Sequence, residues 1–340
     1  MGTIRNALKS GLSPDALRLV DMAHRDSTKR QYQAVWTKFL NYLDINSIDK
    51  DKVTLSVVMN FLSYHAIHMK RKYRTIAAYK CALEVPLKSH FGLEFDSPTF
   101  KLFMRGVFNA DPPQKSSPMP LWSLNDLLEY LNCDYFEPLF TKSFNIITQK
   151  LLCLLLLATG RRIDEVGHLS RKHSDTAQGN AIKLFCVEGF VPKHFDQAFK
   201  PKNPVIDKLD SNGTEDGRLC PVRAFTIYIQ HLGGNPRQSV KVPLWNLDTK
   251  DLTKLFCKVV LHSRLRKNIH DHVSVGPHQV RKLAASYSAV LMGHSKDLER
   301  TLMDRMGCSS MMVLKKNYIS TVPPLNVTCV LPFGTFNTVH

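Results

Sequence analysis

Residues 154–169 read LLLLATGRRIDEVGHL and join two predicted helices through a Thr-Gly-Arg-Arg segment. The apolar run from Ile146 to Ala158 predicts a buried helix that ends at Gly160. A second helix is predicted to begin with Arg162, and Glu165 lies three residues further on the same helix face. A helix N-terminus binds anions, and arginine offers a rigid two-pronged donor for phosphate. The segment therefore predicts a phosphate-binding site, with an exposed helix start and a surface ion pair as the alternative.

A histidine followed three residues later by an arginine occurs three times, where about one match is expected by chance. The motif alone is therefore uninformative, and its context has to distinguish the three pairs. Gly276-Pro277-His278 puts one pair at a predicted helix start, where His278 and Arg281 point the same way. The pair His168/Arg171 is predicted to lie on the helix that begins with Arg162. The pair His68/Arg71 lies in the N-terminal part.

Residues 181–209 alternate between apolar and polar side chains, which predicts a β-hairpin. Lys193 lies at the predicted turn, and Lys200 and Lys202 flank the next strand. From Pro221 to the end the pattern predicts mostly helix, with the proline at a helix start. The second part of the chain is thus expected to be mainly helical with a small sheet.

The run 304–319 contains a tyrosine near the end of a predicted short helix. Ser309 or Ser310 can cap this helix, and Tyr318 lies near its C-terminal end beside two lysines. A tyrosine in such a place is most often a packing residue. The residue type alone therefore does not assign Tyr318 a chemical role.

The N-terminal part of the chain is predicted to be all helical up to a proline-rich linker at 111–120. The first helix is expected to be capped by Ser27, and Pro86 is expected to kink or shorten the third helix. Exposed basic side chains between the second and third helices could contact DNA phosphates, or could form a solvated loop. These basic residues are Lys70, Arg71, Lys72 and Arg74. The second, third and fourth helices are predicted to cover 54–69, 75–90 and 97–108.

The composition points to a polyanionic partner. Lys+Arg total 46 and Asp+Glu 29, which leaves a net charge of +17 and a pI near 9.5. The 8 cysteines are scattered, which favours reduced thiols in an intracellular protein over a disulfide framework or a zinc ribbon. No apolar run approaches the ~20 residues that a membrane span needs, and no metal or nucleotide motif is present. We therefore expect a soluble nucleic-acid-binding protein without a metal site or other cofactor.

The order of these features resembles the tyrosine recombinase (phage-type integrase) family. A TGRRxxE segment is followed by a lysine-bearing hairpin, an HxxR pair, and a tyrosine 37 residues after Arg281. The resemblance implies a mainly α fold with a small β-sheet: a helical, SAM-like core-binding domain and a tyrosine recombinase catalytic domain. It predicts a tail at 1–23, the core-binding domain at 24–110, the linker at 111–120 and the catalytic domain at 121–340. The segment from Gly307 to Tyr318, followed by Cys329 to Gly334, is most similar to Crypton/DIRS-type recombinases of eukaryotic mobile elements.

The resemblance also implies the roles of individual residues. The family's first arginine and its acidic partner fall on Arg162 and Glu165, and its second box falls on His278 and Arg281. Its nucleophile falls on Tyr318, and its hairpin lysine on Lys193, with Lys200 and Lys202 as alternatives. One position departs from the family pattern. Cys308 stands where the family usually has a His or Trp that donates to the phosphate, and a thiol is a weak donor.

The activity implied is cleavage and rejoining of DNA strands through a 3′-phosphotyrosyl bond, with neither metal nor cofactor. Double-stranded DNA is the implied partner, bound by a homo-tetramer with a steep salt dependence, and the nucleus is the implied location. Two alternatives have different consequences. The Cys308 change is compatible with a recombinase-derived DNA-binding protein with little catalysis, and the same residue set would also serve a topoisomerase IB-like enzyme that relaxes supercoils.

Overall fold

The computed structural model describes residues 13–112, 122–176, 181–193, 202–209, 217–233, 239–292, 296–319, 329–331 and 334–336. The chain divides into two compact units, Met1–Lys115 and Ser116–His340, and each is described by itself. The predicted linker residues 113–120 and most of the predicted N-terminal tail lie outside the described residues. Within the described parts of the chain, no helix combines the length and apolar character required to cross a membrane.

The first unit is entirely helical in its described residues. Its core is built from apolar side chains on one face of each helix, including Phe39, Phe61, Leu83 and Phe100. The caps follow the expected chemistry, because the Thr54 and Ser97 hydroxyls accept hydrogen bonds from backbone N–H groups three residues on. The helices are α2 (Pro14–Met22), α3 (Asp26–Ile45), α4 (Leu55–Ile67), α5 (Tyr73–Phe91) and α6 (Pro98–Ala110).

Two details of the first unit differ from expectation. Helix α3 begins at Asp26, one residue before the predicted cap at Ser27. Helix α5 is not shortened by Pro86, because it continues to Phe91 and ends at Gly92 with φ +64. Pro86 is buried in the helical core, so packing of the ring offsets the missing backbone hydrogen bond.

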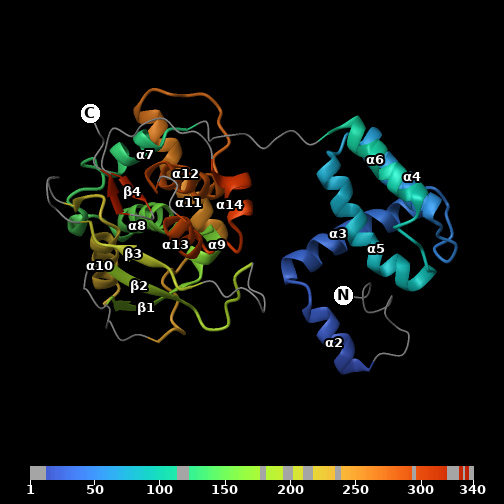
Figure 1. Ribbon diagram of the computed structural model, residues 1–340, viewed down its shortest axis with the longest axis horizontal. Helices are drawn as coiled ribbons and strands as arrows, with labels where there is room; N and C mark the ends of the chain where they lie inside the picture. The colour runs from blue at the N-terminus through green and yellow to red at the C-terminus, as the bar shows by residue number, and fades with distance from the viewer. Residues whose placement is uncertain are drawn as a thin grey trace. The chain divides into compact units, whose positions relative to one another are not determined.

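The second unit is built around α8, which is buried from Ile147 to its end at Thr159. The predicted buried helix is therefore confirmed, and Gly160 ends it with φ +56. Helices α10, α11 and α12 pack on α8 (Figure 1). Gly160, which follows α8, is buried. The helices of this unit that precede its last three are α7 (Leu124–Leu131), the 3₁₀ helix η1 (Leu139–Thr141), α8 (Phe144–Thr159), α9 (Ile163–Gly167), α10 (Pro221–His231) and α11 (Thr249–Arg266).

The sheet has three antiparallel strands in the order β1 (Leu169–Asp175), β2 (Ala181–Cys186) and β3 (Val205–Asp207). The pairing of β2 with β3 confirms the predicted hairpin. The prediction that His168 and Arg171 lie on the helix of Arg162 is wrong. Helix α9 ends at Gly167, and the following backbone pairs with a distant segment: Leu244 N–H donates to the Leu169 carbonyl at 2.7 Å.

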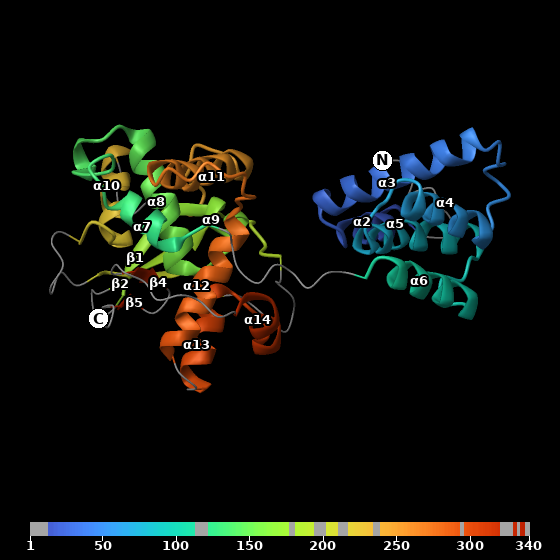
Figure 2. The same ribbon diagram turned by 90° about the horizontal axis from the view of Figure 1, so that it is seen from above.

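The last three helices form a group in the second unit: α12 (Pro277–Met292), α13 (Lys296–Met306) and α14 (Met311–Tyr318) (Figure 2). They enclose a small core that includes Met306, Cys308 and Tyr318. After α14 the chain forms a short hairpin, β4 (Cys329–Leu331) and β5 (Gly334–Phe336). The prediction of helix to the end of the chain is therefore wrong for these six residues, which alternate too briefly to give a strand signal.

A buried ion cluster lies in the second unit, away from the turn at Gly160. Lys150 of α8 is fully buried and donates to Glu137, whose carboxylate also accepts two hydrogen bonds of 2.9 Å from Arg223. Burial by itself raises the pKa of Glu137, but the hydrogen bonds from Arg223 and Lys150 outweigh it and lower the pKa to about 2. Burial lowers the pKa of Lys150 to about 8, against the effect of Glu137.

This cluster predicts an acid-sensitive stability of the second unit. A carboxyl with pKa 4.5 when unfolded and about 2 when folded stabilises the fold above pH 4.5. That stabilisation, about 3 kcal/mol in full, is lost progressively as the pH falls toward 2. We expect urea titrations between pH 6 and 3 to show a shallower loss of stability for Glu137→Gln than for the wild type. If the free energy of unfolding falls equally with pH in the two proteins, the low pKa of Glu137 in the folded state is contradicted.

Candidate active site

The turn between α8 and α9 places two arginines beside one carboxylate. Arg162 is the N-cap residue of α9, and its guanidinium donates to Glu165 Oε1 at 2.9 Å. Glu165 is buried, whereas the Arg162 side chain keeps 18% of its surface exposed. The predicted pairing of Arg162 with Glu165 is confirmed. It holds a cation, partly open to solvent, at the start of α9.

Arg281 of α12 reaches the same turn from the other side. Its guanidinium is 1% exposed and donates to the Gly160 carbonyl at 2.8 Å and to the Met306 carbonyl at 2.7 Å. A third bond of 2.7 Å goes to Cys308 Sγ. The Nε–H of Arg281 is buried and has no hydrogen-bond partner among the described residues. A buried donor without a partner is costly in a folded protein, which is typical of a site that receives a ligand.

Tyr318 and His278 lie against Arg281. The Tyr318 ring is buried, at 6% exposed, and its centroid lies 4.9 Å from Arg281 Cζ and 5.3 Å from the centroid of the His278 imidazole. Burial lowers the pKa of His278, and the charges of Arg281, Arg162 and Lys193 lower it further. His278 is therefore a neutral imidazole at pH 7, with one N–H donor and one acceptor nitrogen.

Cys308 lies directly beside Arg281. Its sulfur accepts a hydrogen bond of 2.7 Å from the Arg281 guanidinium. The residue is 4% exposed and follows Gly307 at the end of α13. The structure therefore joins Cys308 to the candidate site through Arg281.

The candidate lysines differ in their surroundings. Lys193 is exposed, and its charge is one of those that lower the pKa of His278. Three residues before it, the Phe190 ring stacks on His168 at 4.2 Å, which holds this loop against the end of α9. Lys202 instead pairs with Asp304 of α13. Lys200 lies outside the described residues.

One residue of the site was missed from the sequence. Arg161 was given no role, yet its side chain is 3% exposed. The guanidinium donates to Glu165 Oε2 at 3.1 Å, to the Arg305 carbonyl at 2.5 Å, and to the carbonyls of Lys202 and Asp304 at 2.7 and 2.8 Å. The consecutive arginines at 161 and 162 were the available signal. The sequence does not tell which of two adjacent arginines is buried.

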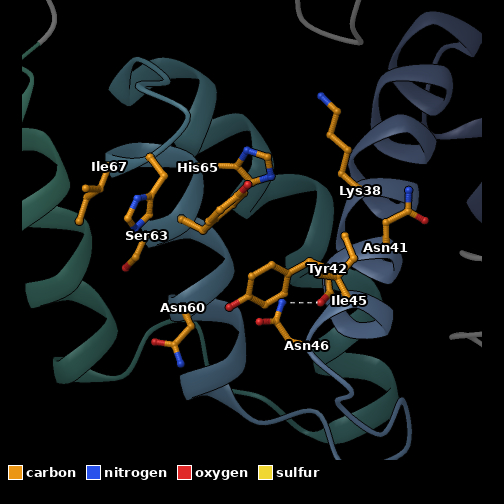
Figure 3. Close-up of a pocket in the computed structure, with 11 residues that line it drawn as sticks. Lys38, Asn41, Tyr42, Ile45, Asn46, Asn60, Ser63, His65 and Ile67 are labelled. Carbon is orange, nitrogen blue, oxygen red and sulfur yellow. Dashed lines mark hydrogen bonds between the residues drawn. The ribbon is translucent and has the colours of Figure 1, made fainter.

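The basic run of the first unit is exposed; it lies between α4 and α5, except for Arg74, which lies in the first turn of α5. Lys70, Arg71 and Arg74 are surface side chains, and Lys72 pairs with Asp111 at 3.0 Å. A pocket of about 460 Å³ opens nearby between α3 and α4 (Figure 3). Amide, hydroxyl, imidazole and ammonium groups line it together with apolar side chains, among them Lys38, Asn41, Asn60, Ser63, His65 and His68. Such groups can donate to phosphates and to base edges.

Comparison with known proteins gives likeness in structure but not in sequence. No protein-family model matches the chain, and no curated protein matches its sequence. The Tn1549 transposon integrase in complex with transposon right end DNA matches over 94% of this chain and 96% of its own, with 16% identity and a TM-score of 0.52.

Two other solved structures give weaker matches. The same integrase with a circular intermediate DNA covers 88% of this chain and 91% of its own, with 16% identity and a TM-score of 0.49. The XerA recombinase covers 93% and 92%, with 14% identity and a TM-score of 0.36. The match at 0.52 shows the fold: the chain is mainly helical with a small antiparallel sheet, and this fold is similar to that of the Tn1549 integrase.

Proposed function

We propose that this protein is a site-specific DNA recombinase that cleaves and rejoins strands through a bond between Tyr318 and a 3′-phosphate. One observation carries the proposal: the buried Nε–H of Arg281, which has no partner within the described segments, lies in a guanidinium covered by the Tyr318 ring. A phosphate donor and a phenol are thus adjacent, with His278 beside them. The fold likeness to the Tn1549 integrase, which was solved in complex with transposon end DNA, supports a protein that acts on DNA.

The proposed reaction is a transfer of a phosphoryl group to the tyrosine. Tyr318 Oη attacks phosphorus, its proton passes to the neutral imidazole of His278, and the bond from phosphorus to O5′ breaks. Arg162 and Arg281 bind the non-bridging oxygens, where charge accumulates in the five-coordinate transition state. Both Arg281 and Tyr318 are buried, so the ring moves off the guanidinium face when the phosphodiester enters.

Lys193 is the proposed general acid that protonates the departing O5′. In support, its ammonium lies close enough to lower the pKa of His278, while Lys202 is engaged with Asp304. Attack by a 5′-hydroxyl on the phosphotyrosine then reverses the chemistry. Glu165 supports the reaction by holding Arg162.

The remaining features belong to the same proposal. The net charge of +17 and the exposed Lys70, Arg71, Lys72 and Arg74 support binding to double-stranded DNA. The fold match to a transposon integrase solved on transposon end DNA supports a mobile-element origin. The similarity of 307–318 to Crypton/DIRS-type recombinases supports a eukaryotic element, and with it a nuclear location. Assembly as a homo-tetramer on DNA follows from the recombinase mechanism.

The test is trapping of a covalent adduct. Duplexes selected from genomic fragments by binding would be nicked next to the cleavage position, so that the short leaving strand is lost after cleavage. In EDTA, the wild type is expected to give an SDS-resistant protein–DNA adduct, and Tyr318→Phe is expected to give none while binding the duplex equally well. Tyr287→Phe, which changes a buried tyrosine that lies on α12 instead of α14, is the matched control and should retain the adduct.

The outcomes separate the proposal from its alternatives. Tight binding without an adduct from the wild type would favour a DNA-binding descendant, with Cys308 as the suspected lesion. An adduct that forms on any duplex, together with relaxation of supercoiled plasmid, would favour a topoisomerase-like enzyme. Either result would overturn site-specific recombination.

A further inference from the structure

We propose that Arg161 is a positioning residue of the strand-transfer site, which sets the geometry of Arg162, Arg281 and the segment leading to Tyr318. This inference rests on the proposed function. Arg161 itself touches no reacting group, because its guanidinium is enclosed by Glu165 and three backbone carbonyls.

The C-terminal end of α13 explains why a buried arginine is needed. The last four carbonyls of a helix have no partner within the helix, and they form the negative end of its dipole. Here the Met303 carbonyl accepts from Cys308 N–H, and the Met306 carbonyl accepts from Arg281. The carbonyls of Asp304 and Arg305 accept from Arg161 at 2.8 and 2.5 Å. Two buried guanidiniums thus hold the end of α13, immediately before Cys308.

Glu165 links this arrangement to Arg162. One carboxylate oxygen accepts from Arg161 at 3.1 Å and the other from Arg162 at 2.9 Å. The carboxylate plane that orients Arg162 is therefore fixed by Arg161. Without it, Glu165 would be held by Arg162 alone, whose side chain is partly exposed and has more freedom.

The third connection runs to the sheet. Arg161 donates to the Lys202 carbonyl at 2.7 Å, and the Lys202 side chain pairs with Asp304. Arg305 adds a salt bridge to Asp207 of β3. The hairpin that carries Lys193 and the segment that leads to Tyr318 are therefore joined at one guanidinium. Removing the Arg161 guanidinium is expected to make the positions of Arg162 and Arg281 less fixed, without removing any group that contacts the phosphate.

The experiment compares two substrates. A methylphosphonate at the mapped cleavage position has lost the charge on one non-bridging oxygen, so it depends less on an accurately placed pair of arginines. Arg161→Gln is expected to slow adduct formation about 100-fold on phosphodiester DNA, as for a misplaced catalytic group. On the methylphosphonate the loss relative to wild type is expected to stay within about tenfold. Arg161→Lys, which keeps the charge but not the fork, should fall between wild type and Arg161→Gln.

Controls separate positioning from folding. Arg264→Gln removes another buried arginine of the same unit, at 4% exposed, and is expected to leave the ratio between the two substrates unchanged. Equal losses on both substrates for Arg161→Gln and Arg161→Lys, or no loss at all, would overturn the positioning role. If the wild type forms no adduct on either substrate, the proposed function fails and the inference fails with it. If Arg161→Gln does not fold, Arg161→Lys alone carries the comparison.

Discussion

Arg281→Lys is expected to reduce the rate of adduct formation by at least about 1000-fold while DNA binding changes little. The substitution keeps the positive charge and removes the planar fork. A guanidinium has five N–H donors, of which three are used by Gly160, Met306 and Cys308. The buried Nε–H has no partner in the part of the chain that the structure describes, so it can bind the phosphate. An ammonium has only three donors at one point, so it cannot hold the turn and the phosphate together.

The measurement is the rate of adduct formation on the nicked duplex, with the affinity for the same duplex measured by fluorescence anisotropy. Arg264→Lys serves as the control, because it changes an arginine of similar burial on α11 that contacts Asp271 instead of the site. A drop in affinity that accounts for the slower adduct formation would contradict a role in the transition state. Retention of more than a tenth of the rate would show that the phosphate is bound elsewhere.

The sequence predicted the local pairing at the start of α9 better than the contacts that distant segments make with it. The pairing of Arg162 with Glu165 follows from their spacing of three residues at a helix start, and the structure has that bond. Local spacing is sufficient there because both residues lie in one turn. The proximity of Arg281 to the Gly160 turn was expected only from the family resemblance, since 121 residues separate the two groups.

The parts that the sequence did not predict depend on contacts between distant segments. The residues after Gly167 form β1 by pairing with β2, and Leu169 and Arg171 also bond to the distant segment 242–244, which no local pattern indicates. Arg161 is buried because the end of α13 supplies two carbonyl acceptors for it. An arginine in isolation is expected at the surface, so its burial could be predicted only with α13 in place.

Gly307→Ala is expected to destabilise the second unit by about 4 kcal/mol and to abolish the adduct. Gly307 has φ +62, a conformation that costs an L-residue about 1–2 kcal/mol. A Cβ at this position would also lie 2.2 Å from Arg161 Nη1 and 2.9 Å from Cζ. The guanidinium cannot move aside without giving up bonds to Glu165 and the α13 carbonyls, each of which costs about 1–3 kcal/mol when its partner stays buried.

Gly233→Ala isolates the clash from the backbone strain. Gly233 also belongs to the second unit and has φ +66, but a Cβ there would meet no atom within 4 Å. Urea unfolding should therefore give a loss of only about 1–2 kcal/mol for Gly233→Ala. In an Arg161→Ala background, the cost of Gly307→Ala should fall to that same value, because the group it meets is gone. If Gly307→Ala costs no more than Gly233→Ala in the wild-type background, then Arg161 is not held firmly at the end of α13. If the cost stays at 4 kcal/mol without Arg161, the destabilisation arises from the turn itself and the guanidinium plays no part in it.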